Sequence, residues 1–155
     1  MNAVEKLMCS FPELTYTYEP LMPNHQDGLI IDDIVYLRPG QSYEQLTQTV
    51  SEEIGHYLTS VGDISDTDKL ENRKQEQKAR DVGATLIVSP QDLLDCYKAG
   101  MVTYWECADF LEVSMEVLER AVNVYSRSCN GKLKYKHYTF YFCANGTIDI
   151  VDWLN

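Results

Sequence analysis

One short segment carries the side chains best suited to chemistry. In SEEIGHY, Glu52 and His56 stand four residues apart, so one helical turn places them on the same face. Two ligands at this spacing can hold one metal ion, and a glutamate beside the first of them, here Glu53, can serve as general base toward a metal-bound water. The pattern reads EExxH, with a glutamate at the position where HExxH has its first histidine.

A third ligand is needed to hold an ion that keeps one position open for water. Glu76 lies on the next predicted helix, and an antiparallel arrangement of the two helices would return it to the side of His56. We therefore expect a site of two carboxylates and one histidine: Glu52, His56 and Glu76. His25, in the loop ahead of the predicted strands, is an alternative source of a second imidazole.

The glutamate at position 52 bears on the choice of metal. Imidazole ligands suit zinc, whereas carboxylates suit harder ions such as manganese. A glutamate in place of a histidine also adds a negative charge, which weakens the ion's pull on its bound water. We expect a divalent metal, zinc first and manganese as the alternative, in a weakened or altered centre.

The helix that positions these groups has a clear beginning. Ser42 is a good N-cap, and Gln45 three residues later completes a capping-box pattern, which predicts a helix from there to about Thr59. Its apolar residues are spaced four apart and therefore share one face: Leu46, Val50 and Ile54.

A second helix is predicted from about Glu71 to Val88, after a loop rich in Gly, Asp and Ser at 62–68. Pro90 is expected to close this helix. An apolar stripe follows one side of it: Ala79, Val82, Leu86 and Ile87. A leading helix and three short strands precede the helix pair, at 3–9, 14–18, 28–31 and 34–37.

The rest of the chain changes character twice. Three further helices are predicted at 91–98, 104–111 and 114–129, the last of them capped by Ser114. Two aromatic-rich, alternating segments then flank Asn145-Gly146, which predicts a β-hairpin with strands inside 135–144 and 147–153. The chain should form one domain in three parts: a core at 1–90, a helical tail at 91–130 and a hairpin at 131–155.

Three stretches together resemble the ImmA/IrrE metallopeptidase family. EEIGHYLTSVGDI looks like its active-site helix and loop, GLIIDDIVYL like its paired strands, and the second helix has its pattern of Glu76, Ala79 three residues on, an apolar stripe and a proline. The resemblance is good over about residues 10–95. It implies an α+β fold with a zincin-like metallopeptidase core, formed by a small twisted sheet and an active-site helix pair.

What the resemblance implies about the site matches the residues above. Glu53 would be the base, His56 and Glu76 would be ligands, and Glu52 stands where the family usually has a histidine. The implied activity is metal-dependent endopeptidase cleavage of a regulatory protein, often a helix-turn-helix repressor of a phage or mobile element. The competing hypothesis is a catalytically inactive protein that keeps the fold and binds such a regulator.

Composition limits the other function classes. A formal net charge of −11 argues against a direct nucleic-acid binder, although residues 91–129 faintly resemble a helix-turn-helix in which Ala108 and Val113 would pack the turn. The basic residues of 132–137 are expected to line a solvated strand. No apolar run could span a membrane, no signal peptide is visible, and the five cysteines are scattered, so we expect a cytoplasmic protein.

Overall fold

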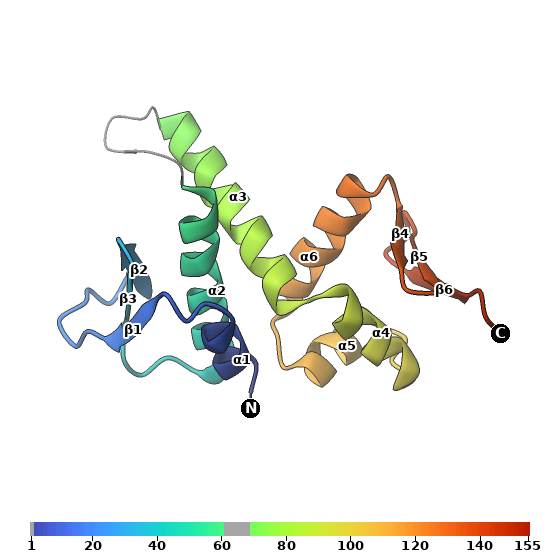
Figure 1. Cartoon of the computed structure of the whole chain (residues 1–155), viewed down its shortest axis with the longest axis horizontal. Helices are drawn as coiled ribbons and strands as arrows, with labels where there is room; N and C mark the ends of the chain where they lie inside the picture. The colour runs from blue at the N-terminus through green and yellow to red at the C-terminus, as the bar shows by residue number, and fades with distance from the viewer. Residues whose placement is uncertain (1, 61–68) are drawn as a thin grey trace. The chain divides into compact units, whose positions relative to one another are not determined.

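The computed structural model describes residues 2–60 and 69–155, with side chains in the second range from Asn72 onward. The loop predicted at 62–68 lies outside these residues. The chain divides into two compact units, Met1–Ile87 and Val88–Asn155, each with its own helices and sheet (Figure 1). In its described part, no helix combines the length and apolar character needed to cross a bilayer.

The described residues of the first unit form three helices and a three-stranded sheet, and the sequence predicted each of these helices and strands. The helices are α1 (Ala3–Ser10), α2 (Tyr43–Thr59) and α3 (Lys69–Ile87), and the strands are β1 (Thr15–Tyr18), β2 (Gly28–Ile31) and β3 (Ile34–Leu37). The strand order is β1-β3-β2, with β1 parallel and β2 antiparallel to the central β3. The strand β2 is therefore an edge of this sheet.

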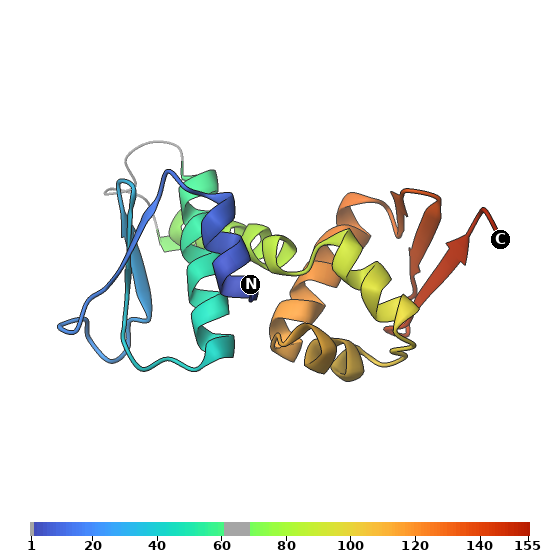
Figure 2. The same ribbon diagram turned by 60° about the horizontal axis from the view of Figure 1, so that its bottom comes forward.

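The predicted apolar face of α2 forms the centre of the core in this unit. Val50 and Ile54 are fully buried, together with Val35 and Leu37 of the central strand. Figure 2 shows α1 and the strands lying along α2. The helix begins as predicted, since the Ser42 side chain accepts a hydrogen bond from the backbone N–H of Gln45 and a capping box is present.

The helices α2 and α3 pack closely because small residues line their contact. The carbonyl oxygen of Ser51 on α2 would lie 2.7 Å from a Cβ added to Gly83, so only a glycine fits there. Gly55 meets the backbone of Ala79 in the same way. This close approach brings the polar residues beside these glycines within reach of each other across the helix pair.

The second unit consists of three helices and a three-stranded antiparallel sheet. The helices are α4 (Pro90–Lys98), α5 (Tyr104–Leu111) and α6 (Met115–Ser128), and the strands are β4 (Lys132–Tyr135), β5 (Tyr138–Phe142) and β6 (Ile148–Asp152), in the order β4-β5-β6. Phe140 of the middle strand and Leu118 of α6 are among its most deeply buried side chains.

Two predictions for this unit need correction. Pro90 does not close the preceding helix, because α3 ends at Ile87 and Pro90 opens α4 behind the N-cap Ser89. The predicted hairpin around Asn145-Gly146 is confirmed for β5 and β6, but the sheet has a third strand. The strand β4 pairs with β5 through a tight turn in which Lys136 takes a positive φ of 54°.

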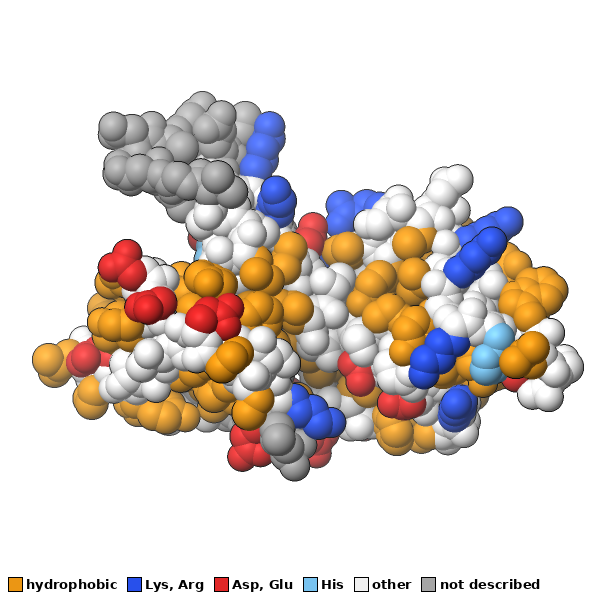
Figure 3. All heavy atoms as spheres, in the orientation of Figure 1, with side chains coloured by type: hydrophobic (Ala, Val, Ile, Leu, Met, Phe, Trp, Pro, Cys, Tyr) orange, Lys and Arg blue, Asp and Glu red, His pale blue; other side chains and the backbone are white. Residues whose placement is uncertain are grey.

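Two smaller predictions for the second unit agree with the exposure of its side chains. Ala108 and Val113, expected to pack the turn between α5 and α6, are both buried. Lys132 and Lys134 occupy the exposed positions of β4, as expected for a solvated strand. Figure 3 shows Lys and Arg side chains gathered over the strands of this unit, with a histidine among them.

Candidate metal centre

Two pairs of side chains face each other across α2 and α3. His56 Nε2 lies 3.4 Å from Glu76 Oε1, so these two predicted ligands are brought together. One turn away, Glu52 Oε1 lies 3.8 Å from Nε of Arg80. Each helix supplies one acid and one base four residues apart, and the antiparallel packing places each acid opposite a base.

The carboxylate of Glu52 is held on the side of Arg80. Its Oε1 accepts a hydrogen bond from Gln48 Nε2 at 3.2 Å and makes the ion pair with Arg80 through the same oxygen. Arg80 was not expected at this site, because arginine is not a residue type that binds metals. The i, i+4 spacing from Glu76 to Arg80 on the second helix was the signal that could have found it.

The predicted base Glu53 lies between α2 and the edge strand β2. Burial, together with the charges of Glu52 and Glu76, raises the pKa of Glu53 to about 7, although a backbone hydrogen bond from Ile30 partly opposes the rise. A Cβ added to Gly28 of β2 would lie 3.3 Å from Glu53 Oε1, so the carboxylate sits against the strand backbone. A carboxyl with this pKa can both accept and release a proton near neutral pH.

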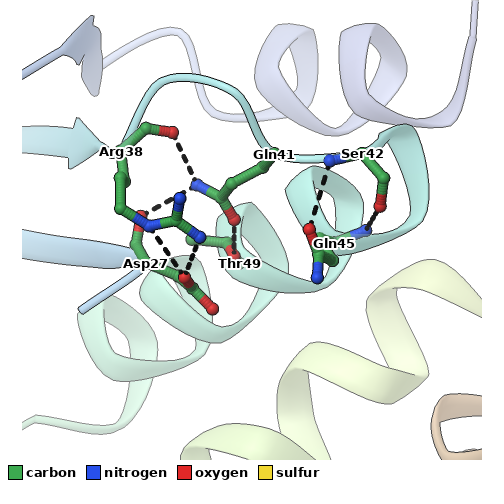
Figure 4. Close-up of polar contacts among 6 residues, drawn as sticks. All are labelled: Asp27, Arg38, Gln41, Ser42, Gln45 and Thr49. Carbon is green, nitrogen blue, oxygen red and sulfur yellow. Dashed lines mark hydrogen bonds and ion pairs between the residues drawn. The ribbon is translucent and has the colours of Figure 1, made fainter. Parts of the chain in front are cut away.

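A polar network fixes the strands to the helix that carries Glu53 (Figure 4). Gln41 donates through Nε2 to the carbonyl oxygens of Asp27 and Arg38, 2.9 Å away in each case, and its Oε1 accepts a hydrogen bond from Thr49 at 2.7 Å. Arg38 in turn pairs with the Asp27 carboxylate at 2.6 Å. The end of β3 and the start of β2 are thus tied to the first half of α2.

The donor types in this centre fit a divalent ion. His56 and Glu76 are close enough to share one ion, and Glu52 is a third donor on the same helix face as His56. Glu52 instead contacts Gln48 and Arg80, and among the described residues no cluster of three or more acid, histidine or cysteine side chains is placed to hold a metal. Two of the three expected ligands therefore converge, and the third is paired with Arg80.

The alternative ligand His25 is exposed, in the loop between β1 and β2. Among the described residues, no contact joins His25 to the helix pair. Its role as a metal ligand therefore stays a prediction without support from the geometry.

Comparison with known families gives a match over the helix pair. The model of Peptidase M78, described as the IrrE N-terminal-like domain, matches residues 13–123, which is more than half of the 155-residue chain and includes α2 and α3. A comparison with curated proteins finds no match.

Proposed function

Since the chain belongs to the IrrE N-terminal-like family of peptidases, we propose that it is a metal-dependent endopeptidase whose centre lies between α2 and α3. The observation that carries this proposal is the 3.4 Å separation of His56 Nε2 and Glu76 Oε1, because it brings an imidazole and a carboxylate from different helices to one point. Glu52 would complete the ligand set.

In this proposal the metal ion and Glu53 have different roles in peptide hydrolysis. A bound divalent ion would supply an activated water and polarise the scissile carbonyl. Glu53 would take a proton from the attacking water and later give it to the leaving amine, and the pKa of about 7 suits both steps. Its contact with Gly28 of β2, and the effect of the Glu76 charge on its pKa, support this role for the carboxylate.

The substrate that we propose is a regulatory protein, such as a helix-turn-helix repressor of a phage or mobile element. This part of the proposal rests on the family resemblance, and it specifies a protein substrate with no direct nucleic-acid contact. The net charge of −11 supports the absence of direct nucleic-acid contact, since a negatively charged protein repels a polyanion.

The test is cleavage of a purified candidate repressor in the presence of zinc or manganese. Glu53→Gln should lower the cleavage rate by a factor of about 10² to 10⁴, because the amide cannot accept the water's proton. Metal content, measured by mass spectrometry of the same sample, should stay that of the wild type. Glu44→Gln is the matched control, since it removes an exposed acid from the same helix. Equal rates for wild type and Glu53→Gln would refute the assigned role.

The Glu52–Arg80 contact favours a second candidate, a protein that keeps the fold and binds a regulator without cleaving it. In that case the wild type would bind the repressor and leave it intact with either metal. A pull-down with the same repressor, analysed for both binding and fragments, separates the two functions.

A further inference from the structure

The centre between α2 and α3 contains three acids and a permanent cation. Glu52, Glu53 and Glu76 lie close enough for the first and third to raise the pKa of the second. Arg80 is the permanent cation, because the charge of His56 depends on protonation. Arg80 therefore supplies, from within the chain, positive charge where a divalent ion would also supply it.

Arg80 forms an ion pair with Glu52 but makes no hydrogen bond through Nε. Its Nε is buried and has no hydrogen-bond partner, although the rest of the side chain is partly exposed. The nearest carboxylate oxygen to which it is paired is Oε1 of Glu52, at 3.8 Å, just beyond hydrogen-bond distance. A buried donor of this kind favours any movement of the carboxylate toward it.

A metal ion needs the same carboxylate. Gln48 and Arg80 both contact Glu52 through Oε1, so this oxygen already lies on the side of Arg80. If Glu52 joins His56 and Glu76 around one ion, Arg80 and the ion share its carboxylate or compete for it, and the guanidinium then lies near a second cation. Like charges at such a separation repel strongly in a partly buried site.

We propose that Arg80 is an internal counter-ion that competes with the divalent ion for Glu52, so that it weakens metal binding and keeps the helix pair folded when no metal is bound. This inference rests on the proposed metal centre, and it assigns Arg80 the role of a positioning residue acting through Glu52.

Zinc affinity tests the competition directly. Calorimetric titration of the whole chain with zinc alone should show that Arg80→Gln binds zinc about tenfold or more tightly than the wild type, because one positive charge leaves the site. Lys78→Gln is the matched control, since it removes an exposed lysine from the same helix. Arg80→Lys, which keeps the charge, should bind zinc as weakly as the wild type.

The partner is tested by a second substitution. In a Glu52→Gln background, Arg80→Gln should no longer tighten zinc binding, because the contested carboxylate is gone. A full gain in that background would overturn the inference, as would equal zinc affinity for Arg80→Gln and Lys78→Gln.

Thermal melting in a chelator separates this inference from the proposed function. Without metal, Arg80→Gln should melt at a lower temperature than Lys78→Gln, because Glu52 is left among acids. If the wild type binds no zinc but Arg80→Gln does, the proposed metal function fails and the inference holds. If no variant binds zinc, the competition for Glu52 is overturned together with the proposed metal function, and equal melting temperatures overturn the role of Arg80 in folding as well.

Discussion

The carbonyl oxygen of Ala79 occupies the space that a Cβ on Gly55 would fill. This contact lies between the two acid–base pairs of the helix pair, since Gly55 precedes His56 and Ala79 precedes Arg80. The absence of a side chain at Gly55 therefore sets how closely α2 and α3 approach, and with it the reach between the candidate ligands.

Gly55→Ala should destabilise the first unit. The added methyl group meets backbone, which cannot turn aside as a flexible side chain can, so overpacking should cost about 2 kcal/mol or more of the free energy of unfolding. Urea unfolding followed by circular dichroism measures it, with Lys78→Ala as an exposed control on α3. Unchanged stability in Gly55→Ala would mean that the helices do not approach as described.

Glu53→Gln should stabilise the fold at alkaline pH and have little effect at pH 5. The raised pKa, about 7 against 4.5, means that the folded state keeps a proton that the unfolded chain releases between these values. The free energy of unfolding of the wild type therefore falls as pH rises through this window. At pH 8 the variant should gain up to about 3 kcal/mol.

Melting temperatures at pH 5 and pH 8, taken in a chelator, measure this difference. The control is Glu13→Gln, which alters an exposed acid outside the site. A gain of equal size at both pH values would show that burial of the carboxyl, and not its ionisation, is responsible.

Gln41→Ala should loosen the attachment of β2 and β3 to α2. It removes two hydrogen bonds to the carbonyl oxygens of Asp27 and Arg38 and one from Thr49, for a loss of about 1 to 2 kcal/mol. Gln41→Glu keeps an acceptor for Thr49 but turns negative oxygen toward two carbonyls, so it should be at least as destabilising. Chemical denaturation compares the two, and wild-type stability in Gln41→Glu would contradict the bridging role of the amide.

Glu52→His should tighten zinc binding most when Arg80 is also changed. A histidine restores the usual ligand type, but Arg80 would still place a positive charge beside it. We expect Glu52→His/Arg80→Gln to bind zinc about tenfold more tightly than Glu52→His alone, as measured by competition with a chromophoric chelator. The same zinc affinity in both variants would show that Arg80 does not influence metal binding at this site.

Local signals in the sequence predicted the parts of the fold that local physics controls. Ser42 and Gln45 indicated the start of α2, and the two short apolar runs on either side of Asp32-Asp33 located β2 and β3 to the residue. The turn at Lys136 escaped prediction, because a lysine seldom takes a positive φ and only the strand pairing on both sides holds it there. The parallel pairing of β1 with β3 escaped for a similar reason, since nothing local specifies it.

The sequence predicted which residues form the candidate site better than it predicted which side chains they contact. The spacing of Glu52, Glu53 and His56 placed them on one helix, and an antiparallel second helix was expected to bring Glu76 beside His56, from which it lies 3.4 Å away. The partner of Glu52 depends on which side chains meet across two helices, which a one-dimensional spacing does not specify. Arg80 therefore emerged only from the packing of α2 against α3.

The strand order of the two sheets has a consequence for the sequence in which they can form. In the second unit each strand pairs with its neighbour along the chain. The strand β5 can therefore pair with β4 as soon as it is synthesised, and β6 can then pair with β5. In the first unit β1 pairs only with β3, and β2 lies between them in the chain. The partner of β1 is therefore synthesised last of the three strands. The strand β1 stays unpaired until β3 has been made and can pair with it.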